Sequence, residues 1–145
     1  MPREAQPNLV DNRHCTMNHD AKLNETPALV NRDDRGVLAA IEFTGVPFSV
    51  KRIFWITDVT PGSSRAGHAH RTCEQFLFCV NGSITATVTD RHGDTYSRTL
   101  TIGDTLHLPP LHWLELSHFS EGSVLGVLAS QHYDRSEYIE DLSQL

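Results

Sequence analysis

Short apolar segments that recur at a spacing of roughly 8–12 residues constrain the fold of this chain more than any other feature. Residues 83–89 show the pattern most clearly, because Ile84, Ala86 and Val88 alternate with polar residues and so share one face of a strand. The dipeptide Asn81-Gly82 just before them is a strong hairpin signal. Strands are predicted over 37–43, 48–57, 75–80, 83–89, 95–102, 105–108, 113–116 and 123–130. This pattern is typical of an all-β sandwich or barrel.

The two ends of the chain differ from this pattern. Residues 1–27 have few strongly apolar side chains and no period, so a flexible N-terminal tail is predicted there. Residues 28–145 are predicted to form one domain, as the length of 145 residues suggests. Residues 135–145 look helical, with Tyr138, Ile139 and Leu142 roughly on one side. A short C-terminal helix is therefore predicted. Tyr138 is expected to pack this last segment, with lining of a pocket as the alternative.

Charge, apolar runs and cysteine content argue against several classes of protein. The chain has 12 basic and 18 acidic side chains, whereas a general nucleic-acid binder needs a basic surface. No apolar run approaches the roughly 18 residues of a membrane helix, and the N-terminus has no signal-peptide pattern. Three cysteines without a CxxC pair fit a reducing compartment. A cytoplasmic protein without a nucleic-acid or membrane partner is expected.

One segment carries the residues best suited to chemistry. His68 and His70 alternate with Ala69, so on a strand both imidazoles point to the same face, and Glu74 follows shortly after. The ordinary pKa of histidine, about 6.5, lets each neutral imidazole accept and return a proton. Enolisation beside a carbonyl needs two such groups and no redox cofactor. Two histidines and a carboxylate could instead hold iron(II), or the pair could be ordinary polar residues of a strand.

The segment from Arg65 to Gln75, followed by Gly82, resembles the first motif of the cupin superfamily. The resemblance implies a cupin-type double-stranded β-helix, or jelly-roll barrel, whose interior receives the two histidines. The second cupin motif would begin at Gly103 and place a histidine where this chain has Leu114. A metal would therefore lack a complete set of protein ligands.

From Asp34 to about Leu142 the chain resembles the WxcM-like dTDP-sugar 3,4-ketoisomerases. The matching stretches are 34–42, 46–52, 65–75, 81–83 and 127–130, with Tyr133, Asp134 and Tyr138 after them. The resemblance implies a homodimer that acts on a dTDP-linked 4-keto-6-deoxyhexose without metal or cofactor. The expected reaction moves the keto group of dTDP-4-keto-6-deoxyglucose from C4 to C3, before transamination in deoxyaminosugar biosynthesis.

The resemblance also implies catalytic roles. His70 is expected to be the base at C3, and His68 its partner at the oxygens or at C4, although the two roles could be reversed. Glu74 would orient an imidazole and fix its tautomer.

The same resemblance suggests residues that bind the substrate. Arg65 would face the sugar or the diphosphate. Arg35 and Arg52 are further diphosphate candidates, because a guanidinium matches phosphate oxygens. Tyr133 is expected to line the pocket.

Some residues depart from the family pattern. Phe54 and Trp55 stand where two tyrosines are common, and Leu114 stands where a Trp-His-Glu stretch has its histidine. The missing hydroxyls could change which C4 epimer is made. Two other functions stay open: a non-catalytic nucleotide-sugar-binding domain, and a metal-dependent cupin such as a small dioxygenase.

Overall fold

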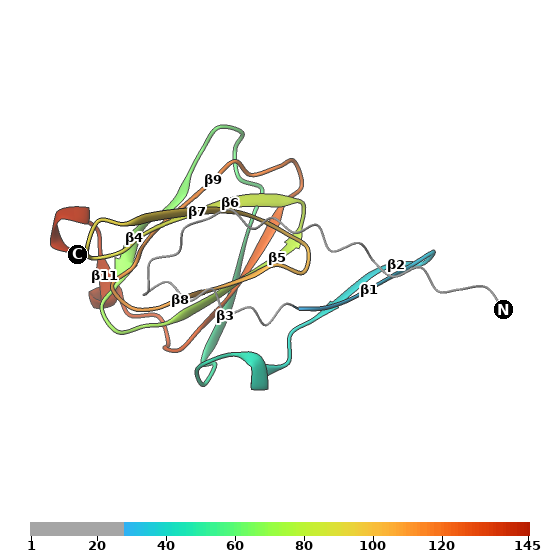
Figure 1. The fold of residues 1–145 in the computed structure, drawn as a ribbon, viewed down its shortest axis with the longest axis horizontal. Coiled ribbons are helices and arrows are strands. Elements are labelled where there is room, and N and C mark those ends of the chain that lie inside the picture. Colours follow the sequence, from blue (N-terminus) through green and yellow to red (C-terminus); the bar gives the residue numbers. More distant parts are fainter. Residues whose placement is uncertain (1–27) are drawn as a thin grey trace.

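The computed structural model describes residues 28–145, and the tail predicted over residues 1–27 lies outside this part of the chain. The described residues form eleven strands and three short 3-10 helices (Figure 1). In chain order these are β1 Leu29–Asp33, β2 Gly36–Ala40, η1 Phe43–Gly45, β3 Arg52–Thr57, β4 Arg65–His70, β5 Gln75–Asn81, β6 Ser83–Thr89, β7 Thr95–Thr101, β8 Thr105–Leu108, β9 Trp113–Ser117, β10 Val124–Ala129, η2 Arg135–Glu137, β11 Tyr138–Ile139 and η3 Leu142–Gln144.

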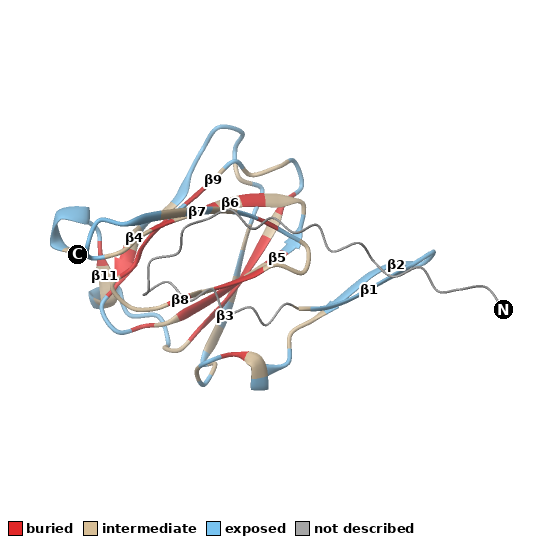
Figure 2. Ribbon diagram, viewed as in Figure 1, coloured by how far each residue is buried: buried red, intermediate tan, exposed pale blue. Residues whose placement is uncertain are grey.

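Two antiparallel sheets face each other across the core. One has the strand order β3-β10-β5-β8 and the other β11-β4-β9-β6-β7. Between them lie apolar side chains from both sheets, and Figure 2 shows the buried residues along these strands. The core includes Leu77, Ile84, Leu100, Leu116 and Leu125, each almost fully buried. The all-β jelly-roll barrel predicted from the sequence is confirmed.

Strand alternation decides which side chains enter the barrel. In β3, Phe54 and Ile56 pack against the core, whereas Ile53 and Trp55 face outward and are 58% and 66% exposed. Successive side chains of a strand point to opposite faces, so Arg52 lies on the same side as Phe54. An arginine therefore faces the interior at the beginning of β3.

A second apolar cluster covers the outside of the four-stranded sheet. Val46, Phe76 and Leu128 form its buried part, and Phe78 packs against it. Gly126, opposite Phe78 in the β10–β5 pairing, makes room for the ring, because a Cβ atom at Gly126 would collide with it. The segment after η1 thus closes this face of the sheet.

β1 and β2 form a hairpin that projects away from the barrel (Figure 1). The hairpin is exposed along nearly its whole length (Figure 2). Leu29 and Leu38 are 65% and 63% exposed. The predicted strand over 37–43 corresponds to β2, which is shorter, and β1 was not predicted.

The single C-terminal helix predicted over 135–145 is wrong. Residues Tyr138 and Ile139 are extended instead and pair with His70 and Ala69 of β4. The two 3-10 helices on either side are capped by Asp134 and Asp141, whose carboxylates accept hydrogen bonds from Ser136 and Ser143. Pairing with the edge of the sheet, which also buries Ile139, outweighs the helical spacing of the apolar residues. No helix in residues 28–145 is long and apolar enough to cross a membrane.

Candidate active site

A bulge in β4 sets the direction of the two histidines. Ala66 and Gly67 have positive φ angles of 66° and 74°, and the pairing with β9 shifts register between Ala66 and His68. After the shift His68 lies opposite Leu114, a member of the core between the sheets. Paired residues share a face, so His68 points into the barrel, and His70 follows it.

The two imidazoles lie beside each other and share an aromatic neighbour. The ring centroids of His68 and His70 are 5.1 Å apart, and the two planes are nearly perpendicular, at 87°. The Tyr138 ring lies 4.7 Å from each of them. The sequence favoured packing of the last segment over pocket lining for Tyr138, because the extended pairing of β11 with β4 could not be recognised from two residues.

Burial keeps both imidazoles neutral. It is the main reason that the pKa of His70 falls to about 4; the charges of His68 and Arg52 lower it further, and Glu137 raises it. Burial also lowers the pKa of His68, while a hydrogen bond with the Ala66 backbone and the charge of Glu140 raise it. At neutral pH each ring can therefore accept a proton.

Both ring nitrogens of His70 are buried and have no hydrogen-bond partner in the described part of the chain. Buried polar atoms in folded proteins are nearly always hydrogen-bonded, so such a ring needs an explanation. A ligand oxygen in the barrel would supply the missing partner.

Arg52 and Tyr133 lie against each other, beside the Tyr138 ring that contacts both histidines. The Arg52 guanidinium lies 5.1 Å from the centre of the Phe54 ring and 5.6 Å from that of Tyr133. Its buried Nε has no hydrogen-bond partner among residues 28–145. Tyr133 is exposed, with its ring 6.0 Å from that of Tyr138. The Arg52 guanidinium is thus held by two aromatic rings, and its Nε is available to donate a hydrogen bond to a ligand.

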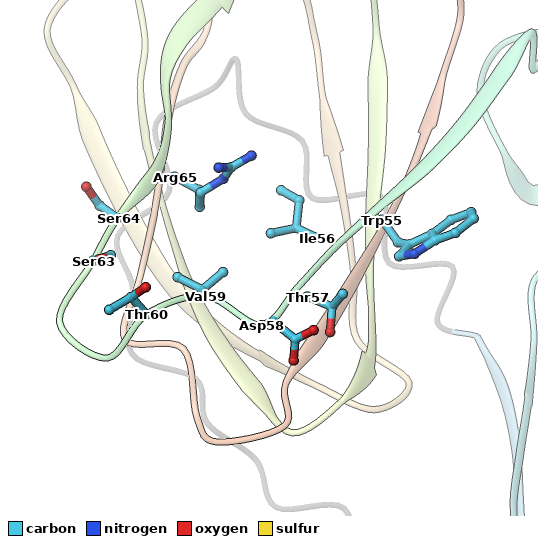
Figure 3. A pocket seen from close by; sticks show the side chains of 9 residues that line it. All are labelled: Trp55, Ile56, Thr57, Asp58, Val59, Thr60, Ser63, Ser64 and Arg65. Carbon is cyan, nitrogen blue, oxygen red and sulfur yellow. The ribbon is translucent and has the colours of Figure 1, made fainter.

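Arg65 lies at the other end of β4 from His70. It lines a cavity of about 450 Å³ formed with residues 55–60, Ser63 and Ser64 (Figure 3). In that view the Arg65 side chain points across the cavity towards Ile56, whereas Trp55 points away. The cavity is rich in hydroxyl groups and adjoins the histidine strand.

Arg35 is not brought to the histidines within one chain. It lies in the turn of the β1–β2 hairpin, paired with Asp33, and its side chain is 83% exposed. That ion pair holds the pKa of the Asp33 carboxyl below its usual range.

Glu74 also lies away from the histidine pair. Its Oε2 is 2.7 Å from Nε2 of His107, whose ring packs near Phe48 of the outer apolar cluster. His107 faces outward because Leu106 and Leu108 on either side of it enter the core. The imidazole that Glu74 orients is therefore His107, and not His68 or His70.

These positions bear on the metal hypothesis. Position 114, opposite His68, is a leucine packed in the core, and Glu74 faces the other side of its sheet. The ring of His112 is held by a hydrogen bond with the Pro110 carbonyl. Among residues 28–145 no three His, Cys, Asp or Glu side chains are grouped to hold a metal ion. The residues that the structure describes around His68 and His70 therefore do not fit a metal centre.

Comparison with known proteins shows the family to which the chain belongs. The family model described as FdtA, WxcM-like, C-terminal matches residues 19–145. The TDP-4-oxo-6-deoxy-alpha-D-glucose-3,4-oxoisomerase of Aneurinibacillus thermoaerophilus is 38% identical over 111 residues, which cover 74% of this chain and 78% of that protein.

Solved structures agree with this placement. A 3,4-ketoisomerase from Helicobacter canadensis has a TM-score of 0.77 and 34% identity, covering 88% of this chain and 95% of its own. A mutant of the 3,4-ketoisomerase QdtA from Thermoanaerobacterium thermosaccharolyticum, in complex with TDP-4-keto-6-deoxyglucose, has a TM-score of 0.75 and 32% identity, covering 81% and 86%. The chain therefore belongs to the FdtA (WxcM-like) family, whose relatives named here are sugar 3,4-ketoisomerases.

Proposed function

We propose that the protein is a cytoplasmic sugar 3,4-ketoisomerase that converts dTDP-4-keto-6-deoxyglucose into a 3-keto sugar, a step that prepares C3 for transamination in deoxyaminosugar biosynthesis. The observation that carries the proposal is the pair of neutral imidazoles, 5.1 Å apart inside the barrel, one of which has two buried nitrogens without a partner in residues 28–145. The names of the relatives supply the sugar.

The geometry suits a proton relay between neighbouring carbons. His70 takes the proton from C3 while the C4 oxygen gains one from His68, which gives an enediol with a C3–C4 double bond. The C3 hydroxyl then gives a proton back to His68, C4 takes the proton held by His70, and the carbonyl is now at C3, with both imidazoles neutral again. The product is an isomer of the substrate, so no oxidant or reductant is consumed. Neutral imidazoles are suited to both directions of transfer.

The remaining candidates fit the charged part of the substrate. Arg52, whose buried Nε has no hydrogen-bond partner in residues 28–145, would contact the sugar oxygens or the diphosphate, and Tyr133 would line the entrance. Arg65 lies three residues before His68, on the other side of the bulge, at the wall of the hydroxyl-rich cavity. That cavity would take the diphosphate end of the nucleotide.

The test is NMR of dTDP-4-keto-6-deoxyglucose incubated with the purified protein. We expect a 3-keto sugar to form, and the coupling at C4 gives its epimer. Binding of the nucleotide sugar without conversion would replace this proposal with a non-catalytic binding domain. If the protein neither converts nor binds the nucleotide sugar, the isomerase and the binding-domain proposals are both contradicted.

We also propose a homodimer, with the β1–β2 hairpin as part of its interface. A lone two-stranded hairpin is marginally stable in water, and this one leaves the apolar side chains of Leu29 and Leu38 exposed. β3, with Ile53 and Trp55 exposed, pairs only with β10 in the described chain and so offers a free edge. A second copy of the chain could cover both surfaces, and only such an arrangement would bring Arg35 to a barrel.

The dimer predicts a mass of about twice 16.2 kDa by light scattering after gel filtration. Replacing Leu38 by aspartate is expected to give a folded monomer. The side chain is 63% exposed within one chain, so the substitution should leave the stability of the single chain unchanged and weaken only the dimer interface. Leu142→Asp, at an exposed leucine of η3, is the matched control and should remain a dimer. A monomeric wild-type protein would refute the proposal.

A further inference from the structure

We propose that Tyr138 is a positioning residue for the two histidines: its ring lies across both imidazoles, fixes the angle between them and keeps water from the face that they turn to the C-terminal segment. The ring centroids are 4.7 Å from His68 and 4.7 Å from His70, with interplanar angles of 53° and 57°. Tilted contacts at this distance are the favoured arrangement of aromatic pairs. One side chain therefore contacts both members of the proposed proton relay.

The segment that carries Tyr138 is fastened to the barrel on both sides of it. Immediately before it, the Glu137 carboxylate accepts hydrogen bonds from the backbone N–H and the hydroxyl of Thr72, each at 2.8 Å, and from the Cys73 N–H at 2.9 Å. Immediately after it, Ile139 is 1% exposed and packs with Ala69 and Trp113. These anchors leave Tyr138 little freedom to move away from the histidines.

The pairing of the strands gives the ring its direction. Tyr138 lies opposite His70, and Ile139 opposite Ala69. Because paired residues point to the same face, Tyr138 joins the histidines on the barrel side while Ile139 joins Ala69 on the other. The arrangement follows from the backbone and does not depend on one rotamer.

The ring contributes to the environment that keeps the imidazoles neutral. The charged or titratable groups that act on His70 are His68 on β4, Arg52 on β3 and Glu137 before β11, but burial is the largest cause of its low pKa. Tyr138 supplies part of that burial. Removing the ring would open both imidazoles to water, whereas removing only the hydroxyl would not.

The first test uses the free protein and needs no substrate. Histidine titrations are followed by NMR in the wild type and in Tyr138→Phe, Tyr138→Leu and Tyr138→Ala, with Leu142→Ala as the control in the same C-terminal segment. In Tyr138→Ala we expect the pKa of His70 to rise from about 4 towards the 6.5 of an ordinary histidine. Tyr138→Phe and the control should keep the wild-type value, and Tyr138→Leu, which packs more closely than alanine, should lie between.

The second test rests on the proposed function and uses kcat/KM as a function of pH. A histidine with a pKa of 6.5 is about 90% protonated at pH 5.5, so Tyr138→Ala should lose about tenfold between pH 8 and pH 5.5 through protonation. The wild type and Tyr138→Phe should lose little over the same range. If the wild type does not isomerise the sugar, the NMR titration still decides the role of the ring.

Two results would overturn the inference. An unchanged His70 pKa in a folded Tyr138→Ala or Tyr138→Leu protein would show that the ring does not shield the pair. A Tyr138→Phe protein that behaves like Tyr138→Ala would show that the hydroxyl, and not the ring, is what the site needs.

Discussion

Asparagine in place of His70 is expected to lower kcat by roughly 10²–10⁴-fold, the usual contribution of a positioned general base. Asparagine keeps a polar side chain of similar size in the barrel but cannot take the C3 proton at neutral pH. The measurement is conversion of dTDP-4-keto-6-deoxyglucose by NMR, with binding of dTDP measured separately to show that the pocket persists.

The assignment of the base is tested by the same reaction in D2O. His70→Asn should also stop exchange of the C3 proton with solvent. His68→Asn should keep that exchange while conversion falls by a comparable factor, because only the transfers at the oxygens or at C4 are lost. The reverse pattern would make His68 the base. Full activity in either variant would contradict the proton relay.

Folding is expected to become less favourable by up to about 3 kcal/mol as the pH falls from 6.5 to 4. The pKa of His70 is depressed to about 4 in the folded protein and is ordinary in the unfolded chain. Between these values the unfolded chain binds the proton and the folded protein does not. The free energy of unfolding is therefore undiminished by His70 above pH 6.5, and it decreases as the pH falls from 6.5 to 4.

Urea unfolding at pH 7.5, 6, 5 and 4 measures this loss. His70→Gln removes the titrating group and should flatten the dependence, while His132→Gln, at an exposed histidine, should leave it as in the wild type. The lowered pKa of the Glu137 carboxyl, to which the charge of His70 contributes, acts below the usual value of about 4.5. An equal slope in wild type and His70→Gln would assign the acid sensitivity to other groups.

The sequence predicts the central strands well because their alternation is regular. Residues 83–89 and 105–108 were predicted with the bounds that the structure has, and the two histidines were correctly expected to share a face. Ordered motifs along three quarters of the chain also sufficed for the family, which is confirmed. Regular two-residue periodicity and local motifs can both be read without knowing what packs where.

Features that depend on partners distant in the sequence could not be predicted. β11 is only two residues long, and its extended form is stabilised by β4, far earlier in the chain. Glu74 comes just before β5, and the sequence does not show which side chains of β5 point into the barrel. Its contact with His107, on the outer face of the four-stranded sheet, follows only from the register of β5 and β8. The roles given to His68, His70, Arg35, Arg52, Arg65 and Tyr133 remain predictions.

The position of β10 between β3 and β5 has a consequence for how fast the protein folds. Arg52 pairs with Ala129 and Thr57 with Val124, so the two strands are far apart in the chain. Until β10 is in place, β3 has no partner in residues 28–145, and Arg52 has no fixed place beside the histidines. Proteins dominated by such non-local pairings fold in milliseconds to seconds. We therefore expect slow folding kinetics, with substrate-binding competence appearing in the last phase.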